Sequence, residues 1–288
     1  MHFIKDILLK HKLIKNNEPV KIKSIGGGCI NDAYLAATDA GNFFIKTKSI
    51  CDENHLCEKE NLEIFLNYGI PAPEPYCQGC IHGISYLVME YLPDTRFQNE
   101  MAIAAHIVAK LHSVTHKDNL FGWHRNNFIG SISQHNVFSD NWTEFYLDYR
   151  IRPLLKQSFE MGYFDKEEVK LWNNLMEKTI PDLLPQKCAS SLLHGDLWYG
   201  NIHFSNKQAY LIDPASYYGH YEVDLAMAKL FGGFDNQFFN QYFELKEYPD
   251  KYFNDRMLVY QIYPLLVHLI LFGWGYKSQL ISILKHFR

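Results

Sequence analysis

The chain has 288 residues, of which 47% are hydrophobic and 21% charged, and its formal net charge is −4 at pH 7. These values exclude an intrinsically disordered chain, and the length allows one large domain or two modest ones, each with its own core. The sequence has no block of lysine and arginine residues, so it does not indicate nucleic acid as a partner.

The two most apolar segments do not indicate export or membrane insertion. Residues 1–12 have helical apolar spacing but lack the apolar segment and small-residue cleavage site of a signal peptide. Residues 257–274 are apolar, but Gln261, Pro264 and His268 interrupt them, which favours a buried helix. The six cysteines are scattered, which suits reduced thiols. We expect a cytoplasmic protein that binds no membrane and is a monomer or a weak dimer.

A glycine-rich turn lies between two strand-like segments near the N-terminus. Residues 20–25 alternate apolar and polar side chains, Gly26, Gly27 and Gly28 follow, and strand character resumes at residues 33–36. Kinases cover the ATP phosphates with the backbone N–H groups of such a hairpin, although any tight hairpin could use the same glycines. The next strand, residues 43–46, ends in Lys46. In kinases a lysine at this point holds the α- and β-phosphates of ATP.

A helix after this strand carries Glu58 and Glu60 near its start. One of the two should pair with Lys46 and hold it toward the phosphates, and we favour Glu60. The alternative is that both glutamates are solvated acids that favourably meet the helix dipole.

An apolar strand at residues 86–92 leads into a polar segment. In a two-lobed kinase this is the hinge, and the backbone of Met89, Glu90 and Tyr91 would contact adenine. The chain before this point is rich in predicted strands, and the remainder is rich in predicted helices. We therefore expect an α+β, two-lobed protein-kinase-like fold with a nucleotide-binding lobe at residues 1–92 and a catalytic and substrate-binding lobe at residues 93–288.

The strongest catalytic signal lies at residues 192–201, Leu-Leu-His-Gly-Asp-Leu-Trp-Tyr-Gly-Asn. Asn201 follows Asp196 by five residues, which is the Asp-to-Asn interval of the kinase catalytic loop. Asp213 ends a strand-like run twelve residues later. Phosphoryl transfer needs an Asp that accepts the hydroxyl proton and hard oxygen ligands for Mg²⁺. The alternative is a polar turn followed by a hairpin with Asn206 and Lys207 at its tip.

At these residues the chain resembles the fructosamine (ketosamine) kinases, within the wider aminoglycoside-phosphotransferase-like kinases. The resemblance covers nearly the whole sequence. The broad superfamily shares the His-Gly-Asp turn, Asn201 and Asp213. Three motifs are much more specific: Leu197-Trp198, Asp213-Pro214-Ala215 with Tyr217-Tyr218-Gly219, and Leu230-Phe231-Gly232-Gly233-Phe234. The resemblance also includes Gly26-Gly27-Gly28-Cys29-Ile30-Asn31, Leu111-His112, Phe121-Gly122-Trp123, Gln134-His135-Asn136 and Glu222-Val223-Asp224.

The resemblance implies ATP-dependent phosphorylation of O3 of a ketoamine, a sugar adduct of a small amine or of a protein lysine. The 3-phosphate is prone to elimination, so the reaction is a deglycation step. By position, Asp196 is the general base, Asn201 and Asp213 hold Mg²⁺, Lys46 clamps the phosphates and Glu60 orients Lys46.

The same resemblance assigns His194, Trp198 and Tyr199 to the substrate pocket. Tyr199 stands where the family more often has a small residue, and Tyr221 stands where arginine is common. These departures leave open whether the sugar is fructose, ribulose or erythrulose. They also leave open whether the amine is free or part of a protein.

Two other functions remain compatible with the sequence. The first is a kinase of the same fold that acts on an aminoglycoside, choline or a simple sugar. The second is a nucleotide-binding pseudokinase, which should lack Lys46, Asp196, Asn201 or Asp213, and all four are present. Cys29 in the glycine-rich turn is either a reactive thiol or a small structural side chain, and the sequence does not decide between them.

Overall fold

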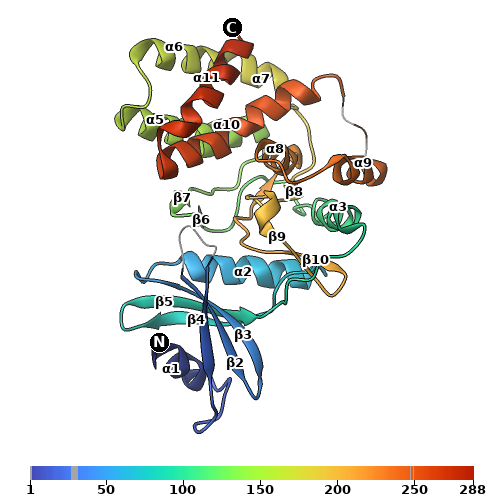
Figure 1. Ribbon diagram of the computed structural model, residues 1–288. Helices are drawn as coiled ribbons and strands as arrows, with labels where there is room; N and C mark the ends of the chain where they lie inside the picture. Colours follow the sequence, from blue (N-terminus) through green and yellow to red (C-terminus); the bar gives the residue numbers. More distant parts are fainter. Residues whose placement is uncertain (1, 27–31, 247, 249) are drawn as a thin grey trace. The chain divides into compact units, whose positions relative to one another are not determined.

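The computed structural model describes residues 2–26, 32–246, 248 and 250–288. The chain forms two compact units (Figure 1). The first comprises Met1–Glu100 and His203–Asp213, and the second comprises Met101–Ile202 and Pro214–Arg288. The division differs from the expected one at residue 92, because the chain returns to the first unit for the hairpin that ends at Asp213.

The first unit contains a five-stranded antiparallel sheet with the strand order β1-β2-β3-β5-β4. Its strands are β1 (Lys21–Ile25), β2 (Asp32–Thr38), β3 (Gly41–Lys48), β4 (Pro75–Ile81) and β5 (Ile84–Glu90). Two helices, α1 (His2–Lys10) and α2 (Asn54–Asn67), belong to the same unit. Strand β4 was not expected, since its sequence, PYCQGCI, lacks a clear apolar–polar alternation.

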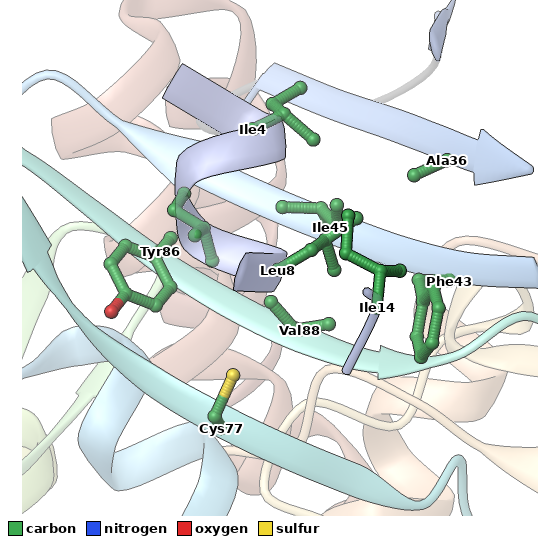
Figure 2. Packing of buried hydrophobic residues seen from close by; sticks show 10 residues of the cluster. Ile4, Leu8, Ile14, Ala36, Phe43, Ile45, Cys77, Tyr86 and Val88 are labelled. Atoms are coloured by element: carbon green, nitrogen blue, oxygen red, sulfur yellow. The ribbon is translucent and has the colours of Figure 1, made fainter. Parts of the chain in front are cut away.

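Helices α1 and α2 cover opposite faces of this sheet. Figure 2 shows Ile4 and Leu8 of α1 packed with Ile45 of β3 and Val88 of β5 in one buried cluster. Successive side chains of a strand point to opposite faces. Lys46, the neighbour of Ile45, therefore points to the other face, on which α2 packs against β4 and β5.

The returning segment forms a second hairpin of the first unit, with strands β9 (Ile202–Ser205) and β10 (Gln208–Leu211). Asn206 and Lys207 form its tip with φ values of 49° and 62°, as the sequence suggested for a hairpin here. The hairpin is held by hydrogen bonds from Thr95 N to Phe204 O and from Leu211 N to Pro71 O, both 2.9 Å. These bonds fix the strand that leads into Asp213.

A disulfide joins Cys51, in the connection between β3 and α2, to Cys80 of β4, with 5.8 Å between the Cα atoms. The expectation of reduced thiols is therefore wrong for this pair. The two residues are 29 positions apart, and the sheet brings them together, because Lys48 at the end of β3 and Cys80 of β4 both pair with Ser85 of β5. Cys77 and Cys188 are free thiols, and Cys29 lies outside the described residues.

The second unit is mainly helical. Its helices are α3 (Glu100–Leu111), α4 (Trp142–Tyr146), α5 (Arg152–Glu160), α6 (Lys166–Asn174), α7 (Ile180–Leu183), α8 (Glu222–Leu230), α9 (Asn236–Leu245), α10 (Phe253–Phe272) and α11 (Lys277–His286). Its strand pairs are β6 (Asn127–Ile129) with β7 (Ile132–Gln134) and β8 (Ser191–Leu192) with β11 (Tyr218–Gly219). The sheet-rich first unit and the helical second unit confirm the expected α+β class.

Two helical stretches of the second unit contain π-helical turns. Residues Leu147–Ile151 link α4 to α5, and Leu175–Thr179 link α6 to α7. Each following helix has a proline, Pro153 or Pro181, in its first turn. Proline has no backbone N–H, so it suits the first turn of a new helix better than the interior of a longer one.

Helix α10 is, among the described residues, the one long and apolar enough to cross a membrane by length and composition. It packs against α5, α8 and α11, and most of its side chains are buried inside the unit. Core helices of soluble proteins meet the same criterion, so this finding alone is weak evidence for a membrane span.

Candidate active site

Lys46 is the centre of the charged cluster in the first unit. Its Nζ donates to Glu58 Oε1 at 2.6 Å and also donates to Asp213. Lys46 and Glu58 are both buried, while the Asp213 side chain remains 45% exposed. The expected lysine–glutamate pair is present, but the expected partner, Glu60, is wrong.

The phase of α2 explains why Glu58 is the partner. The buried face of the helix includes His55, Glu58, Asn61 and Leu62, which follow the i, i+3, i+4 spacing. Glu60 follows Glu58 by two residues, which places it roughly 200° further around the helix axis. Sequence position alone did not determine which of the two glutamates meets the sheet.

Asp213 follows β10 in a left-handed conformation with φ 56°. A non-glycine residue in this region is uncommon, and such strain is often found at functional sites. The unusual backbone allows the half-exposed carboxylate to meet Lys46. A carboxylate in this place offers hard oxygen atoms of the kind that Mg²⁺ prefers.

The other expected nucleotide-binding residues also lie in the first unit. Met89 and Glu90 pair with Phe44 and Phe43 in the sheet, and the Glu90 N–H donates to Glu74 O at 2.8 Å. Tyr91 is the first residue past β5, so its backbone stays the better candidate for contact with adenine. Gly26 is exposed after β1, whereas Gly27 and Gly28 lie outside the described residues.

The second unit carries the turn that the sequence predicts to be catalytic, His194-Gly195-Asp196. The Asn201 side-chain amide donates to the carbonyl of Asp196 at 2.8 Å and to Asp196 Oδ2 at 3.0 Å. Asn201 is thus held by its nitrogen, and neither bond uses its Oδ1, the atom that would bind a metal. The five-residue spacing identified in the sequence therefore brings the expected base and the expected amide ligand into direct contact.

Asp196 is only partly exposed, and its environment changes its acidity. Burial raises the pKa of the Asp196 carboxyl to about 7, with a further raising effect from the negative Asp224, while the hydrogen bond from Asn201 opposes the shift. A general base works best with a pKa near the working pH. The turn therefore provides a carboxylate suited to accept a proton near neutral pH.

Asp224 holds this turn through hydrogen bonds to its backbone. Its Oδ2 accepts from His194 N at 2.7 Å and its Oδ1 from Gly195 N at 3.0 Å. The His194 side chain is fully buried, and its Nδ1 accepts from Asp196 N at 3.3 Å. The expectation that His194 contacts the substrate is therefore corrected, because a buried imidazole within the turn supports its shape.

Trp198 and Tyr199 follow the turn and present aromatic surface. Trp198 is 43% exposed, and its ring covers Gly200, where an added Cβ would lie 2.2 Å from the ring. The Tyr199 ring meets Phe234 edge to face, with 6.0 Å between centroids. A Cβ added at Gly233 would lie 2.4 Å from the Tyr199 Cβ. The absence of a side chain at Gly233 thus makes room for Tyr199.

Buried polar side chains hold the segment after Asp213, a role that the sequence did not indicate. Asn127 donates to Ser216 O at 2.7 Å, and Gln134 donates to Ala215 O at 3.2 Å. The buried Arg150 lies over the Tyr217 ring at 4.0 Å from its centroid. The Gln134 motif was visible in the sequence, but its target lies about eighty residues further along the chain.

The comparisons with known proteins identify the family of the chain. The model of the family described as fructosamine kinase matches residues 2–287. The chain belongs to the fructosamine kinase family. This fructosamine kinase is 35% identical over 277 residues to the chloroplastic protein-ribulosamine 3-kinase of Arabidopsis thaliana, covering 95% of this chain and 84% of the relative. It is 32% identical over 291 residues to the ketosamine-3-kinase of Mus musculus, covering 91% and 93%.

Solved structures confirm the protein-kinase-like fold of the fructosamine kinase chain. A Thermobifida fusca protein assigned to the fructosamine-3-kinases superposes with a TM-score of 0.84 and 26% identity, covering 97% of both chains. An aminoglycoside phosphotransferase in a ternary complex with ADP and hygromycin B has a TM-score of 0.66 at 12% identity, covering 98% of this chain and 97% of that chain. The second likeness concerns the fold alone.

Proposed function

We propose that this fructosamine kinase transfers the γ-phosphoryl group of ATP to O3 of a ketoamine. The observation that carries the proposal is the Asp196 turn, in which Asn201 donates to a carboxyl with a pKa of about 7 and Asp224 accepts from the backbone N–H of Gly195. The names of the relatives support ketoamines as the acceptor class. The proposal covers both small ketoamines and glycated protein lysines.

The chemical step needs a proton acceptor at the sugar hydroxyl. Asp196 accepts a hydrogen bond from the O3 hydroxyl and takes its proton as the O3–phosphorus bond forms. The bond between the γ-phosphorus and the bridging oxygen breaks, and ADP leaves. Phosphoryl transfer of this type depends mainly on positioning and on neutralised charge, so a single well-placed carboxylate is sufficient as base.

Lys46 and Glu58 provide the clamp for the phosphates. Lys46 is shared between two carboxylates, Glu58 and Asp213. ATP brings phosphate oxygens that compete for the same ammonium group. We propose that Lys46 then turns from Asp213 to the phosphates while Glu58 keeps its place, since the buried ion pair fixes the lysine stem.

The residues present fit a magnesium ion. Asp213 supplies a half-exposed carboxylate, and Asn201 supplies an amide oxygen that its own hydrogen bonds do not use. Magnesium commonly keeps several water ligands and binds through one or two protein oxygen atoms together with substrate phosphates. The ion would neutralise the charge that develops on the transferred phosphoryl group.

Trp198 and Tyr199 are proposed to face the ketoamine. Trp198 exposes a large part of its ring beside the turn that carries the base. The amine of a ketoamine is cationic near neutral pH, and an exposed indole face attracts cations. Tyr199 narrows the same surface, so the identity of the preferred sugar depends on this residue.

The test is ATP consumption by the purified chain with Mg²⁺ and a panel of acceptors. The panel contains ribulose and fructose adducts of lysine, a glycated protein, kanamycin, choline and the parent sugars. The proposal predicts turnover on the adducts and none on the parent sugars. Turnover only on kanamycin, choline or a free sugar would keep the phosphotransferase chemistry and refute the acceptor. Absence of both turnover and Mg-ATP binding would refute the enzyme.

A further inference from the structure

The turn that carries Asp196 is held through its backbone. Gly195 has a φ of +83°, and an added Cβ there would lie 2.0 Å from the carbonyl oxygen of Ala215, so the turn has no side chain at this point. The Asp196 carboxylate has to remain available to the acceptor. The N–H groups of His194 and Gly195 both donate to Asp224, which attaches the turn to α8 without using the Asp196 side chain.

Asp224 depends in turn on a histidine from a different helix. Its carboxylate is completely buried, and His112, directly after α3, places Nε2 at 3.0 Å from Asp224 Oδ2. A buried carboxylate is stable only when its oxygen atoms receive hydrogen bonds. The imidazole is the side-chain donor that keeps the carboxylate turned toward the two N–H groups.

Tyr242 of α9 decides which nitrogen of His112 carries the proton. Its hydroxyl lies 2.8 Å from His112 Nδ1, and both side chains are buried. Burial raises the pKa of Tyr242, so the hydroxyl keeps its proton and donates it to Nδ1. An accepting Nδ1 leaves the hydrogen on Nε2, where the Asp224 carboxylate requires a donor.

We propose that His112 and Tyr242 are positioning residues for phosphoryl transfer. Tyr242 orients His112, His112 orients Asp224, and Asp224 fixes the backbone that presents Asp196 to the acceptor. Neither residue touches the reacting atoms. The inference rests on the proposed role of Asp196 as the base, and it couples α3 and α9 to that role.

Two pairs of variants separate positioning from simple support of the fold. His112→Gln keeps a donor near the Nε2 position, and His112→Leu removes it. Tyr242→Phe removes the hydroxyl that bonds to His112. Tyr146→Phe is its matched control. The Tyr146 hydroxyl is also buried and bonds to the carbonyl oxygens of Val259 and Tyr260, both at 3.2 Å, away from the turn.

We expect His112→Leu to lower kcat on the best acceptor about 10- to 100-fold, the factor of a lost hydrogen bond to a charged group. Tyr242→Phe should lower kcat roughly 3- to 10-fold, because the lost hydrogen bond joins two neutral groups and is weaker. His112→Gln should recover most of the kcat that His112→Leu loses. The KM for ATP should stay within about twofold in each variant, because the Lys46 clamp is untouched. Tyr146→Phe should lower thermal stability and leave kcat unchanged.

Hydrogen exchange of the free protein gives a readout that needs no substrate. In His112→Leu and Tyr242→Phe, amide exchange in the peptide 193–201 should become faster, while other buried segments keep the wild-type rate. Tyr146→Phe should leave this peptide unchanged. The inference is overturned if His112→Leu keeps the wild-type kcat and exchange, or if exchange rises equally throughout the second unit. Failure of the acceptor panel would instead refute the proposed function, and the exchange data would still decide the positioning network.

Discussion

Lys46 and Glu58 form a buried ion pair, with 2.6 Å between Nζ and Oε1, whereas Glu60 lies off the face of α2 that meets the sheet. We expect Glu58→Gln to lower kcat/KM for ATP about 10- to 100-fold, because the lysine loses its charged partner in a buried place. Glu60→Gln is the matched control and should remain within about twofold of wild type. Steady-state kinetics with varied ATP separate the two, and equal losses in both variants would contradict the assignment.

Replacement of Asp196 should have opposite effects on activity and on stability. We expect Asp196→Asn to lower kcat about 10²- to 10⁴-fold, the range for a lost general base. The folded-state pKa of about 7 lies above the ordinary value of 3.8, so ionisation of Asp196 destabilises the folded protein as pH rises through this window.

The asparagine variant should therefore be more stable than wild type, by roughly 2–4 kcal/mol above pH 7, and the gain should vanish toward pH 4. Thermal unfolding of the nucleotide-free protein at pH 5 and pH 8 measures the difference. A stability gain that does not grow with pH would show that the carboxyl is not held protonated by its surroundings.

His220 should make the protein sensitive to acid. Burial, together with the positive charge of Arg256, lowers its pKa from 6.5 to about 3. A depressed folded-state pKa means that the unfolded chain binds a proton first, so stability falls as pH drops below 6.5. We expect a loss of about 2 kcal/mol between pH 7 and pH 5 from this residue. Urea unfolding of His220→Asn should give a flatter pH dependence, and an unchanged slope would assign the acid sensitivity to other groups.

The Cys51–Cys80 disulfide should stabilise the first unit. It closes a loop of about 30 residues, for which the chain-entropy relation gives about 3–4 kcal/mol at 25 °C. The double variant Cys51→Ser with Cys80→Ser should unfold at lower denaturant concentration than the oxidised wild type and should no longer respond to dithiothreitol. Cys188→Ser, in the second unit, should keep the wild-type response. A wild type that dithiothreitol does not destabilise would contradict the prediction.

Tyr199 should be displaced by a substitution at Gly233. An added Cβ in Gly233→Ala would lie 2.4 Å from the Tyr199 Cβ, and the φ of +89° is unfavourable for alanine. We expect the KM for the ketoamine to rise about 5- to 20-fold while the KM for ATP stays within about twofold. This is the pattern expected when an enzyme loses binding energy for one substrate only. Gly232→Ala is the matched control, since it shares the positive φ but meets no atom within 4 Å. Equal changes in both variants would indicate a general backbone effect.

The sequence by itself determined the local parts of this enzyme. The Asp196–Asn201 spacing, the strand that ends near Lys46, the hairpin tip at Asn206 and the α+β division follow from short-range periodicity and from residues close together in the chain. Such features depend on backbone geometry within one or two elements, which sequence pattern reports directly.

Only the tertiary structure decided the contacts between distant residues. The choice of Glu58 depends on the rotation of α2 against the sheet, and the Cys51–Cys80 bond depends on the pairing of β3 and β4 with β5. The contact of His112 with Asp224 spans 112 positions, and its contact with Tyr242 spans 130. Burial of the turn also sets the acidity of Asp196, because the desolvation that raises its pKa is a property of the packed chain and not of its neighbours in sequence.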